Sequence, residues 1–250
     1  MGRLFRWFSR PLLALQDSEK AHSRSLLLLR LASSNPIFRG VLRFLYKPRK
    51  SLETTCFDLE FSHPFGLAAG MDKRAEALRG WESIGLAFSE IGGVTMLEQS
   101  GNPKPRMFRH GQDRALVNRM GFNNPGSEKI VERLRRAGEQ TIPIWANLGK
   151  SKRTPLDEAK EDYSTSLTRL WPFIDLFVIN VSSPNTPGLR ELQHGEHLKG
   201  ILDECQKANR TCAKQNDAAE KPLLIKVAPD LNTTELESIL DMAISCGIDG

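Results

Sequence analysis

The sequence predicts an α/β protein in which helices cover a parallel sheet. After residue 51, short apolar runs alternate with longer segments of helical periodicity. The apolar runs are almost continuously hydrophobic, which is typical of strands buried on both faces. The 250 residues are enough for one large domain or two small ones. Both a doubly wound sheet and a TIM barrel satisfy this pattern.

Five strand–helix units are expected along the chain. The strands are expected at 64–70, as the second arm of a hairpin that starts at Cys56, and at 88–95, 143–149, 175–183 and 223–229. The helices are expected at 73–84, 126–138, 154–170, 191–215 and from Asn232 or Thr233 to about 246, with Thr154 capping the third and Pro155 in its first turn. A hairpin insertion is expected around residues 110–113. The pattern stops at Gly250, so a barrel would contain about five of its eight units.

Residues 1–46 are expected to form a basic, amphipathic helical segment, joined through residues 47–51 to the domain at 47–250. Residues 1–50 carry 11 of the 35 Lys and Arg residues but only Asp17 and Glu19 as acids, although the whole chain has a net charge of +5. The segment contains two apolar runs, within residues 2–16 and 18–32. Neither has the roughly 18–20 uninterrupted apolar residues that a membrane-spanning helix needs. Three interpretations stay open: helices on an anionic membrane surface, helices packed on the main domain, and contact with nucleic acid, which no recognised motif supports.

The four cysteines are scattered and predict no structural framework. They are Cys56, Cys205, Cys212 and Cys246, and none forms a CxxC pair or a Cys/His set with zinc spacing. We therefore expect reduced thiols in a cytosolic-type compartment and no metal site. The N-terminal segment also shows no secretory cleavage site.

Single polar residues interrupt four of the expected strands. Asn147, Asn180 and Lys226 stand near the carboxyl ends of three successive strands, and Glu90 stands in an earlier one. One such residue alone would be typical of a satisfied core polar group, because burying an unpaired amide costs a few kcal/mol. Three of them at the edge where α/β proteins bind ligands favour a shared site. The amides and the positive charge suit a planar, heteroatom-rich ligand that becomes anionic, and a flavin ring fits.

Loops beside these strand ends supply small and polar residues. Residues 68–70, Ala-Ala-Gly, would let the backbone approach a flat ligand, and Lys73 follows as a point charge. The loop SSPNTPG at 182–188 follows Asn180 directly. A serine without a histidine is a poor nucleophile, but its hydroxyl can accept a proton that it passes on at once. A rigid βα loop with a capping serine is the alternative interpretation.

Seven motifs occur in order between residues 66 and 231: GLAAGMDK, EIGGVT, GNPKPRMFR, NRMGFNNPG, ANLGKSK, INVSSPNTPGLR and IKVAPDL. On these motifs the sequence resembles a class 2, quinone-dependent dihydroorotate dehydrogenase over essentially all of residues 50–250. The combination of INVSSPNTPGLR with NRMGFNN is the most specific part. The basic N-terminal extension also resembles class 2, whose members are membrane-associated, whereas soluble class 1 members lack it and use a cysteine as base. The resemblance implies a TIM barrel with FMN at its carboxyl-terminal mouth.

The resemblance further implies oxidation of (S)-dihydroorotate to orotate in pyrimidine synthesis, with electrons passed on to a quinone. Ser183 would be the catalytic residue, taking the C5 proton while hydride leaves C6 for the flavin. Gly93 stands where similar members usually have Thr or Ser, so only its backbone could reach the flavin. The implied FMN contacts are Ala69, Gly70, Met71, Asp72, Lys73, Gly93, Asn147, Asn180 and Lys226. The implied substrate contacts are Lys73, Asn118, Arg119, Met120, Gly121, Phe122, Asn180 and Asn185.

By the same resemblance, residues 1–45 would form the quinone entrance and contact lipid peripherally. The location would be the cytoplasmic side of a bacterial inner membrane, with no nucleic acid partner. Family members continue past the position of Gly250 into strands that bind the FMN phosphate. We therefore expect an open barrel that holds FMN weakly. The alternatives are an inactive fragment of this enzyme, or a related FMN barrel acting on another pyrimidine, against which the basic arm and Ser183 argue.

Overall fold

The computed structural model describes residues 7, 10–186, 188–193 and 195–250. Most of the first ten residues of the expected amphipathic segment, together with Pro187 and His194, therefore lie outside the described residues. The centre of the fold is a parallel sheet in the order β3-β6-β7-β8. Its strands are β3 (Ser89–Val94), β6 (Ile144–Leu148), β7 (Leu176–Asn180) and β8 (Leu223–Lys226). The expected parallel α/β fold is confirmed.

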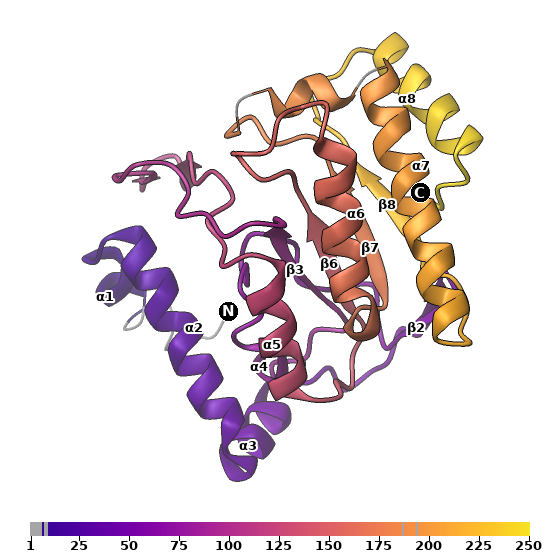
Figure 1. Cartoon of the computed structure of the whole chain (residues 1–250). Coiled ribbons are helices and arrows are strands. Elements are labelled where there is room, and N and C mark those ends of the chain that lie inside the picture. Colours follow the sequence, from indigo (N-terminus) through magenta and orange to yellow (C-terminus); the bar gives the residue numbers. More distant parts are fainter. Residues whose placement is uncertain (1–6, 8–9, 187, 194) are drawn as a thin grey trace.

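Helices follow each strand and cover one face of the sheet, as Figure 1 shows. They are α4 (Leu78–Ser83), α5 (Ser127–Ala137), α6 (Ala159–Leu170), α7 (Gly195–Gln215) and α8 (Thr233–Ser245), with short 3₁₀ turns η2 (Trp171–Phe173) and η3 (Leu189–Gln193). The strands lie side by side in the order in which the chain makes them. A doubly wound sheet would reverse direction at a switch point. This sheet has no reversal among its described strands, which makes it an arc of a barrel.

Extended chain lies along both edges of the arc. On one edge, Leu67 N donates to Phe88 O at 3.0 Å, and Gly70 N donates to Gly92 O at 2.8 Å. Residues 67–70 thus follow the first expected strand position, although only Leu67 forms a bridge. On the other edge, Ile225 N donates to Gly250 O at 2.9 Å. The backbone of Gly250 therefore pairs with β8 at the position of a sixth strand.

Side chains of the sheet divide between two environments, because successive residues of a strand point to opposite faces. One set faces the helices and forms the main apolar core, with fully buried members such as Ile91, Ala146 and Ile179. The register places the other set in rows on the opposite face, where Glu90 pairs with Trp145 and Asn180 with Lys226. At the amino ends of the strands the rings of Phe88 and Trp145 stack at 4.2 Å. The polar set lies beyond them, toward the carboxyl ends.

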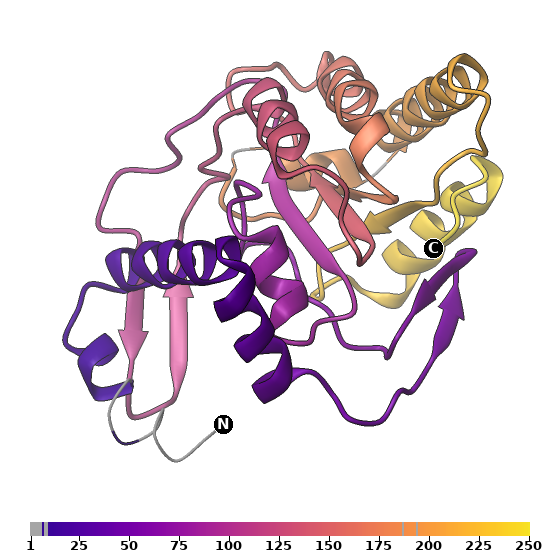
Figure 2. The same ribbon diagram turned by 90° about the horizontal axis from the view of Figure 1, so that it is seen from below.

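Three N-terminal helices lie beside the sheet, α1 (Arg10–Ala14), α2 (Ser18–Ser34) and α3 (Pro36–Tyr46). Figure 2 shows α2 running next to the hairpin of β4 (Met107–His110) and β5 (Ala115–Asn118), which was expected around residues 110–113. Leu26 of α2 packs on Ala77 and Trp81 near α4. A second hairpin, β1 (Thr54–Cys56) with β2 (Leu59–Phe61), follows the linker. The division at residues 46 and 47 stays a prediction.

Within the residues that the structure describes, no helix combines the length and the apolar character needed to cross a bilayer.

Several expected boundaries are wrong, and side-chain hydrogen bonds explain most of them. The helix expected at 73–84 begins only at Leu78, because Asp72 accepts the backbone N–H groups of Glu76 and Ala77 and holds a loop there. Helix α6 begins at Ala159, and Thr154 does not cap it. The Thr154 hydroxyl donates instead to the carboxylate of Asp162, inside the helix. The hairpin after Cys56 pairs β1 with β2 and leaves residues 64–70 separate, and α7 starts four residues late, after η3. Asn232 caps α8 through a capping box, as expected.

Candidate functional site

A cavity of about 1330 Å³ opens at the carboxyl ends of the strands. One side of it is formed by strand ends and by the loops that follow them. The other side is formed by α1, α2 and the β4–β5 hairpin, through residues such as Leu13, His22 and Met107. The location is the one at which barrel and open-sheet α/β proteins bind their ligands.

Four polar side chains form a continuous row across three neighbouring strands, here called the polar row: Glu90, Asn147, Asn180 and Ser182. Asn147 Nδ2 donates to Glu90 Oε1 at 2.8 Å, and Asn180 Nδ2 donates to Asn147 Oδ1 at 2.8 Å. Asn180 Oδ1 then accepts the backbone N–H and the hydroxyl of Ser182, at 3.1 and 2.9 Å. Glu90 is held from the other side, because Ala69 N donates to its Oε2 at 2.9 Å. The row fixes both amides in one orientation, at the floor of the cavity.

The cavity brings together most of the residues expected to contact a flavin. Its lining includes Ala69, Gly70, Met71, Lys73, Gly93, Asn147, Asn180 and Lys226. Among the described residues, the Lys226 ammonium has no hydrogen-bond or ion-pair partner, and each amide of the row keeps one N–H that no other group receives. The site therefore presents an excess of donors and, with Lys73 and Lys226 among its lining residues, positive charge.

Asp72 is the exception among these residues, because it is fully buried and does not line the cavity. Its Oδ2 accepts the indole N–H of Trp81 at 3.0 Å and the backbone N–H of Ala77 at 2.9 Å. Its Oδ1 accepts the backbone N–H of Glu76 at 2.7 Å. The side chain of Asp72 thus shapes the loop that presents Lys73 to the cavity.

The residues expected to bind the substrate also converge, with one exception. Asn118, Met120, Gly121, Phe122 and Asn185 line the same cavity as Lys73 and Asn180. Arg119 does not, because its guanidinium donates to the backbone oxygen of Pro105, at 2.9 and 3.2 Å. Arg119 therefore stabilises the base of the hairpin.

Ser183 lies at the cavity wall on the loop after β7. Its Oγ accepts the backbone N–H of Asn185 at 3.3 Å. Within the described part of the chain, no histidine, carboxylate or lysine is hydrogen-bonded to this hydroxyl. The geometry is that of a positioned hydroxyl, and it lacks the adjacent base of an activated nucleophile.

Gly93 faces the ring of Phe122 and not an empty space. A Cβ built on Gly93 would lie 2.7 Å from the Phe122 ring, and a Cβ on Gly149 would meet the opposite side of that ring, also at 2.7 Å. Two glycines therefore enclose the ring, which lines the cavity beside Asn147. This packing gives a physical reason for glycine at position 93.

Burial lowers the pKa of two basic side chains near the cavity. The pKa of Lys73 is lowered from 10.5 chiefly by desolvation, with Arg106 and Arg74 adding to the effect and Glu19 opposing it. The pKa of His22 is lowered from 6.5 by desolvation and then by the charge of Lys73. An anion that reached Lys73 would reverse this effect, because it would stabilise the charged form.

Sequence reasoning missed the role of Glu90. The sequence marks it as a polar residue in an apolar strand but does not place it in the site. The available signal was its position as the second residue of a strand that is buried throughout, since a buried carboxylate needs partners. No sequence signal named those partners.

The fold is that of a TIM-barrel-type α/β protein, with a cavity at the carboxyl ends of its strands. The profile of the family described as dihydroorotate dehydrogenase matches residues 51–250. The chain belongs to the dihydroorotate dehydrogenase family.

Named relatives and solved structures agree with this assignment. The chain is 48% identical over 242 residues to a dihydroorotate dehydrogenase (quinone) of Gloeobacter violaceus, covering 96% of this chain and 64% of the relative. It is 41% identical over 250 residues to one of Chloroflexus aurantiacus, covering 98% and 69%. A crystal structure of DHODH from Eimeria tenella in complex with ferulenol is similar with a TM-score of 0.82 at 33% identity, covering 93% of this chain and 65% of that one. The chain thus spans about two thirds of the length of the curated relatives that it matches.

Proposed function

We propose that this site binds FMN and oxidises (S)-dihydroorotate to orotate, with a membrane quinone as the final electron acceptor. The convergence of Asn147, Asn180, Lys226 and the Ser183 loop on one cavity carries the proposal. The curated relatives named dihydroorotate dehydrogenase (quinone) support the same reaction.

The donor set of the cavity fits a flavin. The free N–H groups of Asn147 and Asn180 and the ammonium of Lys226 match the acceptors on the pyrimidine edge of the isoalloxazine ring. A Cβ built on Gly70 would meet no atom within 4 Å, so the backbone there leaves room for a flat ligand. Bound FMN would supply the two-electron acceptor for the reaction. Lys226 would stabilise negative charge on the reduced ring.

The remaining cavity residues fit an anionic, amide-rich substrate. Lys73 offers a charge for the substrate carboxylate, and Asn118 and Asn185 offer amides for the ring. Ser183 would accept the C5 proton of dihydroorotate while it gives its own hydroxyl proton to water or a neighbouring hydroxyl, because no basic side chain is hydrogen-bonded to it among the described residues. Phe122 and Met120 would exclude water from that side.

The cavity continues between α2 and the β4–β5 hairpin, which supports entry of a quinone there. Leu13, His22, Met107 and Leu116 line this part. Arg109 donates to the backbone oxygen of Ala14 at 3.0 Å and joins the hairpin to the end of α1. The apolar side chains of this part suit a lipid-soluble acceptor, and the basic side chains of Arg10, Arg109 and Arg114 line the same cavity.

The exposed faces of the N-terminal helices support peripheral binding to a membrane, proposed here as the cytoplasmic face of the inner membrane. The described part of α3 has no buried residue, and Phe44 is 85% exposed. Leu15, after α1, is 86% exposed. Arginines such as Arg39 lie among these apolar groups. This composition suits a helix at an anionic lipid surface.

The test compares the unmodified protein with Ser183→Ala, both saturated with added FMN. Quinone reduction that depends on dihydroorotate is measured at neutral pH, and flavin binding is measured by fluorescence. We expect the unmodified protein to turn over, and the variant to bind flavin equally well but lose most of its turnover, by roughly a hundredfold or more. Absence of turnover in the unmodified protein would contradict the proposed reaction. Equal turnover in both would remove Ser183 from the mechanism.

A further inference from the structure

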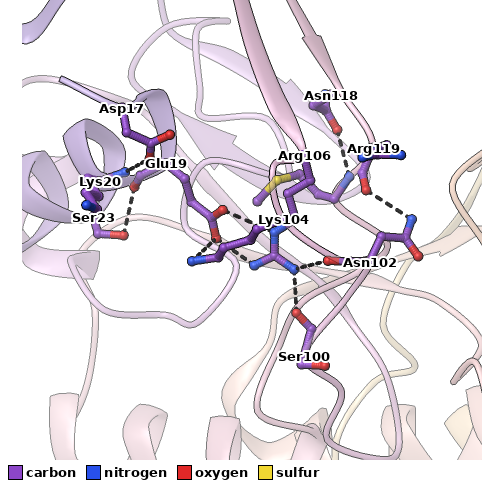
Figure 3. Close-up of polar contacts among 11 residues, drawn as sticks. Asp17, Glu19, Lys20, Ser23, Ser100, Asn102, Lys104, Arg106, Asn118 and Arg119 are labelled. Carbon is purple, nitrogen blue, oxygen red and sulfur yellow. Dashed lines mark hydrogen bonds and ion pairs between the residues drawn. The ribbon is translucent and has the colours of Figure 1, made fainter. Parts of the chain in front are cut away.

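A continuous series of polar contacts connects α2 to the loop that carries Ser183. It is called here the Glu19–Ser183 series, and it runs through Arg106, Asn102 and Asn185. Figure 3 shows its first part, from Glu19 to Asn102. The series joins segments that are far apart in the sequence but lie on opposite sides of the cavity.

The first member is a buried ion pair. Arg106 Nε and Nη2 donate to the two carboxylate oxygens of Glu19, at 3.1 and 2.6 Å. Only 7% of the Arg106 side chain and 16% of the Glu19 side chain are exposed. The third nitrogen, Nη1, donates to the backbone oxygens of Ser100 at 2.6 Å and of Asn102 at 2.9 Å. Arg106 thus fixes the loop at 100–102 relative to α2, with every nitrogen engaged.

The second member is the side chain of Asn102. Its Nδ2 donates to the backbone oxygen of Arg119 at 3.0 Å and to the backbone oxygen of Asn185 at 3.1 Å. Its own backbone N–H donates to Met120 O at 3.0 Å. A Cβ on Gly121 would lie 2.8 Å from the carboxamide of Asn102, so the side chain is closely packed. Asn102 therefore joins the segment that contains Asn118 to the Ser183 loop.

The last member is the backbone of Asn185. Its carbonyl oxygen accepts the side-chain N–H of Asn102, and its backbone N–H donates to Ser183 Oγ at 3.3 Å. The position of the Asn102 side chain thus determines where the Asn185 backbone N–H lies, and this N–H donates to the Ser183 hydroxyl.

We propose that Asn102 is a positioning residue for Ser183, and that Arg106 and Glu19 tie this positioning to the seating of α2. The inference rests on the proposed role of Ser183 in proton removal. Near its middle, α2 is held by apolar packing of Leu26 on Ala77 and Trp81. The Glu19 end is held by the Arg106 ion pair. A shift of the Glu19 end of α2 would therefore be transmitted to the Ser183 loop through the hydrogen bonds of Arg106 and Asn102.

Hydrogen exchange of the purified protein tests the structural part without requiring activity. The peptides covering residues 182–193 are compared in the unmodified protein, Asn102→Ala and Asn102→Asp, which keeps the shape but removes the donor. Gln99→Ala is the matched control, because Gln99 Nε2 donates to Gly121 O at 3.0 Å in the same segment but does not contact the Ser183 loop. We expect both Asn102 variants to exchange roughly threefold to tenfold faster in 182–193, and the control to match the unmodified protein there.

Glu19→Ala tests the connection to α2. We expect faster exchange in residues 100–106 and, to a smaller extent, in 182–193. Faster exchange confined to α2 would overturn the coupling.

Kinetics with saturating FMN test the functional part. We expect Asn102→Asp to lower kcat by roughly tenfold or more while flavin affinity stays within about twofold, because the displaced group is the proton acceptor. Unchanged exchange in 182–193 in both Asn102 variants would overturn the proposal, whether or not the protein is active. Faster exchange with unchanged kcat would show that Asn102 holds the loop but does not position Ser183. If the unmodified protein itself shows no turnover, the proposed function fails while the exchange result still decides the structural part.

Discussion

The polar row makes a specific prediction about Glu90. The carboxylate accepts two donors, from Asn147 at 2.8 Å and from the Ala69 backbone at 2.9 Å. Glu90→Gln keeps the shape of the side chain but replaces one of its two acceptor oxygens with an NH2 group. One of the two donors, Asn147 or the Ala69 backbone, would then face an N–H group and lose its hydrogen bond. Asn147 is fully buried, and water cannot replace the lost partner.

The expected cost follows from the contact that is lost. A buried hydrogen bond to a charged group contributes about 1.5–3 kcal/mol. Urea unfolding with a slope of roughly 3 kcal/mol/M should therefore show a midpoint lowered by roughly 0.5–1 M. FMN affinity should fall as well, because Asn147 would turn to find a new acceptor.

A second substitution provides the control. Asn147→Asp alone places two carboxylates 2.8 Å apart and should destabilise the protein. In the double variant Glu90→Gln with Asn147→Asp, the glutamine amide can donate to the new carboxylate, which still accepts from Asn180. We expect the double variant to recover most of the stability lost by either single variant. Additive losses, or an unchanged midpoint in Glu90→Gln, would refute the reasoning.

Two further predictions concern the N-terminal helices. The Arg106 hydrogen bonds hold the pKa of Glu19 below its ordinary 4.5, so its contribution to stability is present above pH 4.5 and is lost as the pH falls through the lower folded value. Urea unfolding between about pH 3 and 7 should show that the unfolding free energy of Glu19→Gln falls less steeply with decreasing pH than that of the unmodified protein. The same pH dependence in both proteins would contradict this linkage. Phe44→Glu should weaken binding to anionic lipid vesicles by roughly tenfold or more. Phe44 is exposed, and burying one Phe side chain in lipid contributes about 1.5–3 kcal/mol of binding free energy. Leu236→Glu on α8 is the control, and an equal loss in both variants would argue against a specific membrane face.

The order of the elements and the positions of the unusual polar residues can be predicted from the sequence. Alternating periodicity placed the strands, and a buried strand makes each polar residue conspicuous, as it did for Asn147 and Asn180. The expected helix starts failed where side chains competed with the backbone. Asp72 and Thr154 are examples, because their partners are known only once the chain has folded.

Which polar groups meet could be read from the folded chain alone. The strand–helix periodicity allowed both a doubly wound sheet and a barrel, the family resemblance implied the barrel, and the spatial order of β3, β6, β7 and β8 agrees with it. Glu90 joined the site because the register sets its strand beside that of Asn147. Asn102 reached the Ser183 loop across 83 residues of chain. Such contacts depend on distances of a few ångströms between distant segments, and periodicity along the chain carries no information about them.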